Sequence, residues 1–531
     1  MRLHPLAAFL AVPLALAGQA LDQQTLLKPP ADAWPTYNGD YSGRRYSTLA
    51  EINASNIGGL ALAWFYRIAN VGAQRGVGNP KITSTPLMVN GILYFTIPDH
   101  VWAVDARTGE EIWHYGWQDK GGHLVGNRGL GMYGEWLYFM TPDCWFLSLN
   151  AKDGKERWRK KVADEKMQYF CTTAPMVVKN HILVGVGGDA MDVPGFLDAR
   201  DPETGELHWR WNSTPRKGEP NADTWPNPQA MEHGGGMTWM PGTYDPELNL
   251  IYWGTGNPNP VFAGQGRKGA NLYTASIVAL NPDTGKLVWY HQPSPHDTHD
   301  WDNVETPVLF DGVFNGQPRK MLAQAARNGI FTVLDRTNGK SLVTKGYVGV
   351  NWMKGTDAKG QPIPDPAKEP KVDGSLINTP GGGGTNWAPP SYNPLTGLFY
   401  LNAKQGYSVT YLTDTDPEPQ GYGGGGGGGL SEPVLLALDY KTGNAAWKHK
   451  YASGGFGNAF PGVLTTAGKL VFTGDPVGNL LAFDAAKGSI LWHFRTGSMV
   501  SNGPSTYMLN GSQYLIAGAG DTLFAFKLVK K

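Results

Sequence analysis

Ala103-Val104-Asp105-Ala106-Arg107-Thr108-Gly109-Glu110-Glu111-Ile112-Trp113 is the stretch of sequence that decides the fold. Two small or apolar residues precede an Asp, a turn containing Thr-Gly follows, and a Trp comes shortly after. This order is typical of a β-hairpin, because the Asp can accept hydrogen bonds from backbone donors and the Gly tolerates a positive φ. The Trp then lies in the strand after the turn, where its ring can pack against a neighbouring unit.

The same pattern recurs along the whole chain. Further copies end at Trp158, Trp209, Trp289, Val343, Trp447 and Trp492, and a copy without its turn ends at Trp64. The spacings of 49 residues from Trp64 to Trp113 and 45 from Trp113 to Trp158 leave room for four short strands and their loops,. Eight copies predict an all-β fold, namely an eight-bladed β-propeller with tryptophan docking motifs. We expect Trp64 to complete a blade whose other strands come from the C-terminus, which would close the ring.

The composition agrees with a β-rich chain and excludes several classes of protein. Of the 531 residues, 71 are glycine and 11% are aromatic, whereas only 17% are charged. The 41% hydrophobic content excludes a disordered chain,. Lys+Arg and Asp+Glu are 45 each, so nothing indicates binding to nucleic acid or to an anionic membrane,.

Residues 1–20 are interpreted as a secretory signal peptide, because Arg2 precedes an apolar run that is too short to span a bilayer,. Residues 21–531 are then a single exported propeller domain with no membrane span, which predicts a periplasmic location. Cys144 and Cys171 permit one disulfide in an oxidising compartment, although two free buried thiols fit the sequence equally well,. The glycine run from Gly423 to Gly429 is predicted to be a flexible surface loop,.

The segment from His296 to Asn303 is unusually rich in Asp and His. Asp300 and Asp302 are two residues apart, so in an extended segment both carboxylates point to one side and could bind a hard cation such as Ca²⁺. The alternative is an Asp-rich surface turn. Gly129 to Gly134 matches the glycine pattern of nicotinamide-binding proteins, but a strand rather than a helix is expected to follow it, which argues against that function,.

With these motifs the chain resembles the PQQ-dependent (quinoprotein) alcohol dehydrogenases of the methanol/ethanol type, over almost the whole mature length. The Trp repeats are similar to the docking motifs of that family. The segment Trp34-Pro35-Thr36-Tyr37-Asn38-Gly39-Asp40 is similar to its N-terminal signature. The resemblance implies two cofactors, PQQ and a lanthanide(III) or Ca²⁺ ion.

The resemblance also implies a role for individual residues. Asp300 matches the catalytic base, and Trp239 matches the indole that forms the floor under the quinone ring. The residues expected to contact PQQ are Arg128, Thr172, Trp239, Arg327, Asn386 and Trp387. The residues expected to bind the metal are Asn257, Asp300, Asp302 and Asp189. Asp302 resembles the additional Asp that marks lanthanide-using members of the family.

The chain departs from the family pattern at two places. Gly122-His123 replaces the pair of adjacent cysteines that the family carries over the quinone. Ala190 falls on the position of a metal-binding Glu, which leaves Asp189 or Asp192 as its substitute. The first departure affects the roof of the cofactor pocket, and the second affects the choice of metal.

The resemblance implies oxidation of a primary short-chain alcohol to the aldehyde, with Asp300 accepting the hydroxyl proton and Arg327 stabilising the reduced quinone. Since there is no haem-attachment motif, the electrons would pass to a separate soluble cytochrome c. A homodimer is compatible with the sequence. Two alternatives stay open: a non-catalytic propeller scaffold or ligand-binding protein of the outer-membrane assembly type, and a degenerate quinoprotein that binds ligand without turnover.

Overall fold

The computed structural model describes residues 21–529, except residues 22, 70, 72–78, 119–120, 122–123, 189–191, 453 and 458–459. The predicted signal peptide, residues 1–20, lies outside the described residues. Strands are the main regular elements of the described chain, which also has two short α-helices and five 3-10 turns. These are α1 (Gln23–Leu26), α2 (Pro228–Glu232), η1 (Ile57–Gly59), η2 (Glu165–Met167), η3 (Ala222–Thr224), η4 (Gly264–Arg267) and η5 (Pro366–Lys368).

Within the described residues, the strands form eight sheets of four or five strands and one sheet of two. The first two sheets are β3 (Leu87–Val89), β4 (Ile92–Ile97), β5 (His100–Asp105) and β6 (Glu111–Gly116), and then β7 (Gly131–Tyr133), β8 (Trp136–Met140), β9 (Trp145–Asn150) and β10 (Glu156–Lys161). The next two are β11 (Met176–Val178), β12 (His181–Gly185), β13 (Phe196–Arg200) and β14 (Leu207–Asn212), and then β15 (Thr243–Asp245), β16 (Leu250–Gly254), β17 (Ile277–Leu280) and β18 (Leu287–His291).

The remaining sheets follow the same order, and the last two each include a strand from the N-terminal part of the chain. The fifth sheet is β19 (Val308–Phe314), β20 (Gln317–Ala325), β21 (Ile330–Asp335) and β22 (Lys340–Gly346), and β23 (Met353–Thr356) pairs with β24 (Pro362–Pro364). The sixth is β25 (Ser375–Ile377), β26 (Ser391–Asn393), β27 (Leu398–Leu412), β28 (Gly424–Asp439) and β29 (Ala445–Lys450). The seventh is β1 (Tyr46–Ser47), β30 (Leu464–Thr466), β31 (Leu470–Gly474), β32 (Asn479–Asp484) and β33 (Ile490–Arg495). The eighth is β2 (Leu60–Arg67), β34 (Ser505–Leu509), β35 (Ser512–Ala519) and β36 (Thr522–Leu528).

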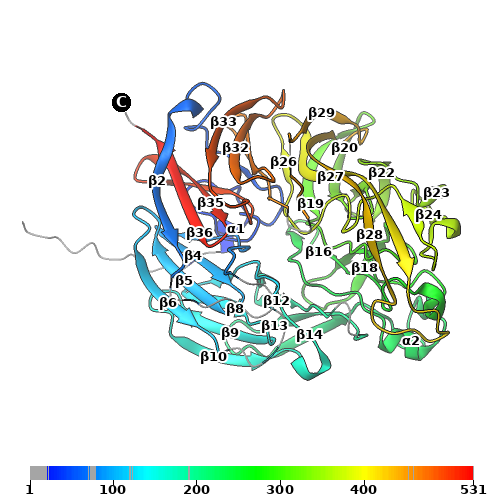
Figure 1. Ribbon diagram of the computed structural model, residues 1–531. Coiled ribbons are helices and arrows are strands. Elements are labelled where there is room, and N and C mark those ends of the chain that lie inside the picture. The colour runs from blue at the N-terminus through cyan, green and yellow to red at the C-terminus, as the bar shows by residue number, and fades with distance from the viewer. Residues whose placement is uncertain are drawn as a thin grey trace, which may run out of the picture.

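The prediction that Trp64 lies in a sheet with C-terminal strands is confirmed, because β2 pairs antiparallel with β36. Figure 1 shows the sheets following one another around the molecule in chain order, with the blue β2 beside the red β36. Apolar side chains fill the space between neighbouring sheets, and the largest cluster runs through the first four.

The repeated Trp residues contact the turn of the next sheet. A Cβ atom on Gly109 would lie 2.6 Å from the Trp64 ring, and Gly109 has a φ of 76°, so this turn requires glycine,. The Trp64 indole also donates a hydrogen bond to the Ala106 carbonyl (3.2 Å). Equivalent ring-to-glycine contacts join Trp113 to Gly154, Trp158 to Gly205, Trp209 to Gly285, Trp289 to Gly339 and Trp447 to Gly488. Where Trp is replaced by Val343, the Val343 and Lys345 side chains cover Gly443.

We expect Trp64→Ala to lower the free energy of unfolding by about 3–5 kcal/mol, because it empties the buried space between the eighth and first sheets. Trp64 is 8% exposed, whereas its neighbour Phe65 is 59% exposed and makes a matched control. Phe65→Ala should cost less than about 1 kcal/mol. Urea denaturation of both variants measures the difference, and equal losses would contradict a docking role for Trp64.

Two further sequence questions are answered by the structure. Cys144 and Cys171 form a disulfide, so the alternative of two free thiols is wrong. The prediction of a flexible loop at Gly423–Gly429 is also wrong, because Gly424 to Gly429 begin the strand β28 and pair with the end of β27. Strand pairing uses backbone groups, so a run without side chains can pair when its partner strand is long enough. No helix in the described part of the chain is long and apolar enough to cross a membrane.

Candidate functional site

An arginine between two aspartates forms the centre of the candidate site. Arg327 lies in the turn between β20 and β21, and Asp300 and Asp302 lie in the segment between β18 and β19. Arg327 Nη2 donates to Asp300 Oδ2 (3.0 Å), and Arg327 Nη1 donates to Asp302 Oδ2. The Asp302 side chain is 1% exposed, whereas the Asp300 side chain is 27% exposed. Asp302 is therefore enclosed, and Asp300 is the carboxylate that a small molecule can reach.

Burial and charge together change the acidity of these groups. The pKa of Asp300 is raised to about 6, mainly by burial and also by the Asp302 carboxylate, while Arg327 opposes the rise,. Burial lowers the pKa of Arg327, but Asp300, Asp302 and Glu305 outweigh burial, so the net shift is upward. The guanidinium therefore stays charged. Asp300 accepts a proton more readily than an exposed carboxylate does, which suits a general base.

Asn257 lies beside this group and presents an oxygen atom. Its backbone N–H donates to Asp302 Oδ1 (3.0 Å), which fixes the loop after β16 against the aspartate. Asn257 is 1% exposed, and its Oδ1 atom has no hydrogen-bond partner among the described residues. A buried carbonyl oxygen without a donor next to carboxylates is the kind of ligand that a hard cation prefers. These oxygen donors fit a Ca²⁺ or lanthanide ion.

The metal site is not completed by the described residues. They contain no group of three or more His, Cys, Asp or Glu side chains that could hold a metal ion. Asp189, the predicted fourth ligand, lies outside the described residues, as does the Gly122-His123 pair. Asp192 is described, and its Oδ2 accepts the Gly421 backbone N–H (2.8 Å). Asp192 lines a separate open cavity of about 700 Å³ with Asn259 and Arg267.

The residues predicted to contact a planar cofactor form an aromatic and cationic group. The Arg128 guanidinium lies 5.0 Å from the centroid of the Trp239 ring and 4.6 Å from that of Trp387. Thr172 is tied to both neighbours, because its carbonyl accepts the Arg128 N–H (2.9 Å) and its hydroxyl donates to the Trp239 carbonyl (3.3 Å). Asn386 Oδ1 accepts the Trp387 N–H (2.8 Å). A cation beside flat rings fits an anionic aromatic cofactor such as PQQ.

Backbone hydrogen bonds connect the two groups. The Gly384 N–H donates to the Arg327 carbonyl (2.8 Å), two residues before Asn386 and Trp387. The Gly256 N–H donates to the Met237 carbonyl (2.7 Å), which links the Asn257 loop to the Trp239 segment. The structure thus places nine of the predicted site residues in two connected groups, and the tenth, Asp189, is outside the described residues.

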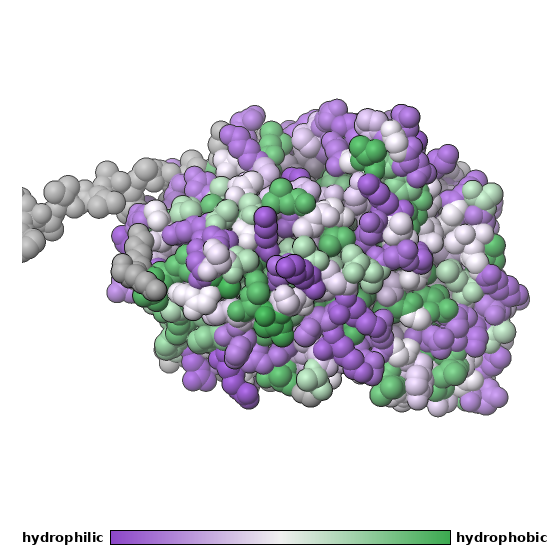
Figure 2. Space-filling model, turned by 90° about the horizontal axis from the view of Figure 1, so that it is seen from above, coloured by the Kyte–Doolittle hydropathy of each residue, from purple (hydrophilic) through white to green (hydrophobic). Residues whose placement is uncertain are grey.

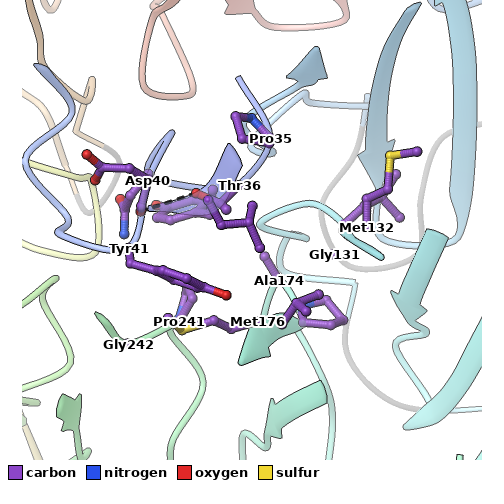
Figure 3. A pocket seen from close by; sticks show the side chains of 16 residues that line it. Pro35, Thr36, Asp40, Tyr41, Gly131, Met132, Ala174, Met176, Pro241 and Gly242 are labelled. Atoms are coloured by element: carbon purple, nitrogen blue, oxygen red, sulfur yellow. Dashed lines mark hydrogen bonds between the residues drawn. The ribbon is translucent and has the colours of Figure 1, made fainter. Parts of the chain in front are cut away.

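A cavity of about 340 Å³ opens beside Asp300. It is lined by Phe262, His299, Asp300, Trp301, Ile377, Thr379, Pro380, Gly381, Gly382, Ser408, Thr410 and Gly426. A different pocket, shown in Figure 3, lies between the N-terminal segment around Thr36 and Tyr41 and the strands β7, which holds Met132, and β11, which holds Met176. That pocket holds only about 20 Å³ and includes none of the predicted site residues, so it has room for about one water molecule,.

Two charged residues near the site were missed by the sequence reasoning. Glu305 is 2% exposed, and burial raises its pKa to about 8, although Arg327 and nearby backbone N–H groups oppose the rise. Lys404 is 3% exposed and donates from Nζ to the carbonyls of Gly381 (2.7 Å) and Gly457 (2.8 Å). Glu305 could have been found from its place three residues after Asp302. Nothing in the sequence around Lys404 marks it as buried.

Comparison with known families gives two matches. The glucose/ethanol/alcohol dehydrogenase β-propeller domain (PQQ) matches residues 34–370. The outer membrane protein assembly factor BamB matches residues 431–527. The BamB structure from Moraxella catarrhalis has a TM-score of 0.50 at 13% identity, which shows a shared fold and nothing more.

Similar proteins cover most of the chain. The quinohemoprotein alcohol dehydrogenase of Comamonas testosteroni is 40% identical over 532 residues, which is 92% of this chain and 72% of that protein. Its crystal structure has a TM-score of 0.87 and covers 97% of this chain and 83% of that one. The quinoprotein alcohol dehydrogenase PedH of Pseudomonas putida is 36% identical over 90% of this chain and 84% of its own length. A europium-containing methanol dehydrogenase has a TM-score of 0.84 at 27% identity, covering 96% of this chain and all of that one.

The propeller-type all-β fold, the Asp300–Arg327–Asp302 group and the Arg128 guanidinium beside two indole rings agree with a cofactor-dependent oxidoreductase. With these relatives, the chain belongs to the family of PQQ-dependent alcohol dehydrogenases.

Proposed function

We propose that the protein oxidises a primary, short-chain alcohol to the aldehyde, using PQQ and a Lewis-acid metal ion. The observation that carries this proposal is the Arg327 guanidinium held between Asp300 and Asp302 beside a cavity of about 340 Å³. The proposal extends to location and partner: the protein works in the periplasm, after removal of residues 1–20, and passes electrons to a separate soluble cytochrome c. The fold would be a ring of eight blades in a single domain.

Each residue has a distinct task in this proposal. When bound, PQQ would supply the two-electron acceptor and the cation would supply Lewis acidity. Asp300 accepts the hydroxyl proton of the alcohol at its carboxylate, since it is the more accessible of the two aspartates,. Arg327 orients both carboxylates and offsets negative charge. Asn257 and Asp302 would hold the cation through oxygen atoms, and Trp239, Trp387, Arg128, Thr172 and Asn386 would enclose the planar cofactor.

The test of this function is reconstitution of the purified protein with PQQ and either Ca²⁺ or La³⁺, followed by dye-linked oxidation of ethanol and other primary alcohols. We expect activity that needs both PQQ and a metal ion. A scaffold of the outer-membrane assembly type predicts no bound PQQ, and a degenerate quinoprotein predicts bound PQQ without turnover. The absorbance spectrum of the reconstituted protein distinguishes these two outcomes.

We expect La³⁺ or Ce³⁺ to support more activity than Ca²⁺. A trivalent ion needs more negative charge around it, and Asp302 adds a carboxylate next to Asn257,. Asp302→Ala should therefore weaken lanthanide binding more than PQQ binding. Trp-sensitised Tb³⁺ luminescence measures lanthanide binding, and titration with PQQ measures PQQ binding.

The control for this experiment is Asp192→Ala, which removes a carboxylate that accepts the Gly421 backbone N–H. It should leave the metal preference unchanged if Asp302 is the residue responsible. Equal or higher activity with Ca²⁺ in the unmodified protein would overturn the lanthanide preference.

A further inference from the structure

The sixth sheet extends beyond the ring as a single layer of three strands. We call this layer the hairpin sheet; it consists of β25 (Ser375–Ile377) and the paired residues 407–412 of β27 and 424–430 of β28. Leu376 pairs with Val409, Tyr411 with Gly425, and Tyr407 with Leu430. Because directly paired residues point to the same side of an antiparallel sheet, the layer has two distinct faces.

The inner face of the hairpin sheet is a wall of the cavity beside Asp300. Ile377 pairs with Ser408, and Thr410 pairs with Gly426. All four residues line the cavity of about 340 Å³ that contains Asp300. Ser408 and Thr410 are buried there, at 2% and 4% exposure. This side of the layer therefore belongs to the candidate active site.

The outer face is apolar and open to solvent. Leu376 is 50% exposed, Tyr407 43%, Tyr411 42% and Leu430 56%. Large apolar and aromatic side chains are rarely gathered on an open sheet face without a binding role. Figure 2 shows one face of the molecule, on which hydrophobic and hydrophilic residues are interspersed.

Between these side chains lie two glycines, Gly425 and Gly427, at positions where the fold does not require glycine. Gly425 and Gly427 have no positive φ that would need glycine, and a Cβ atom on either would meet nothing within 4 Å. Glycine in the interior of a strand weakens the strand. Neither the backbone conformation nor the packing within the described chain explains why these positions are glycine. The close approach of another molecule to this face is the remaining physical reason.

Acidic residues form a rim at the end of the hairpin sheet, in the connection from β27 to β28. Asp414 lies two residues after the end of β27, and its backbone N–H donates to the Gly423 carbonyl (3.0 Å), just before β28 begins. Asp416 and Glu418 continue this connection, and both are exposed. Asp414 and Asp416 each accept a backbone N–H, at 2.9 and 3.0 Å, and none of the three carboxylates forms an ion pair with a described residue. The rim therefore attracts a cationic partner.

We propose that the outer face of the hairpin sheet is the docking surface for the electron acceptor, a small one-electron carrier protein whose exposed redox group is surrounded by Lys and Arg. This inference rests on the proposed function and names where its partner binds. A carrier seated on this face is separated from the cavity by one layer, about 10 Å, the spacing of packed sheets. Each alcohol oxidised releases two electrons and two protons, so two carrier molecules are reduced in turn and the protons leave to water.

The test is a variant with Gly425→Val and Gly427→Val, assayed with two acceptors. One acceptor is a small dye, and the other is a lysine-rich c-type cytochrome. Added side chains should block close approach of the cytochrome and lower kcat/KM for it at least tenfold, mainly through KM. The dye-linked rate and the thermal midpoint should stay the same or rise, since Val favours a strand. Gly58→Val, at another open glycine in η1, is the matched control.

The acidic rim gives a second variant, Asp414→Asn with Asp416→Asn and Glu418→Gln. It should lower the rate with cytochrome at low ionic strength and flatten the dependence of that rate on salt, without changing the dye-linked rate. Unchanged cytochrome kinetics in both variants would overturn the docking surface. If the face instead joins two copies of this chain, sedimentation of the glycine variant would show loss of a dimer, which also overturns the proposal. An unmodified protein without dye-linked activity would refute the proposed function itself.

Discussion

Asp300→Asn is expected to lower the rate of alcohol oxidation by about 10²–10⁴-fold while leaving the fold intact. The amide keeps the size of the side chain but cannot accept the hydroxyl proton. Asp300 is the aspartate exposed to the cavity, and burial raises its pKa to about 6, so the native carboxylate can take up a proton at neutral pH. The measurement is dye-linked kcat after reconstitution with PQQ and metal, with circular dichroism and PQQ affinity as readouts of the fold and site.

Asp302→Asn is the matched control, since both aspartates contact the same guanidinium. It should weaken metal binding, and added La³⁺ should restore part of the activity. No metal concentration should restore Asp300→Asn. If Asp302→Asn proves inactive at saturating metal while Asp300→Asn stays active, then Asp302 is the base and the two roles are exchanged.

Arg327→Met is expected to destabilise the protein by about 3–5 kcal/mol at pH 7, because it leaves the buried Asp302 carboxylate and the partly exposed Asp300 carboxylate close together without their counter-charge,. The sign of the pH effect follows from this arrangement. Arg327 opposes the rise in the pKa of Asp300, so without Arg327 this pKa in the folded state should lie still further above its ordinary value, and the folded state should bind the proton more tightly. The loss of stability should therefore shrink as the pH falls through the raised pKa of Asp300.

Urea denaturation at pH 7 and pH 5 measures this effect. Arg327→Lys keeps one positive charge and should lose less stability than Arg327→Met. The double variant Arg327→Met with Asp302→Asn should regain part of the loss, since it removes one of the two unpaired charges. The same loss for Arg327→Met at both pH values would contradict the electrostatic explanation.

The repeat predicted the parts of the fold that depend on local chemistry. The turn around Gly109 and the following Trp113 could be recognised from adjacent residues, and so could the place of Trp64 in a sheet with C-terminal strands. The sequence does not decide whether the disulfide forms, because Cys144 and Cys171 are separated by 27 residues and the distance between them depends on the fold. The residues of the candidate site could be predicted because the family resemblance assigned them. No local pattern in the sequence marks a residue such as Asn257.

The missed features depend on partners that are distant in sequence. The composition of the glycine run predicts a loop, but pairing with Tyr411 and neighbouring residues of β27 makes it a strand. Lys404 looks like an ordinary strand lysine. Its burial follows from carbonyls at Gly381 and Gly457, which are 23 and 53 residues away. Glu305 likewise becomes part of the site only because the turn after β20 brings Arg327 close to it.

The pairing of β2 with β36 has a consequence for how the protein reaches its native state. Residues 67 and 521, which form an ion pair at this seam, are 454 residues apart. β2 therefore cannot pair with β36 until almost the entire chain has been synthesised. The large sequence separation makes this pairing a late and slow step of folding. Until then β2 and the edge of β36 are exposed to other chains,. The pairing of β2 with β36 is thus the step of folding at which the chain either reaches its native state or aggregates.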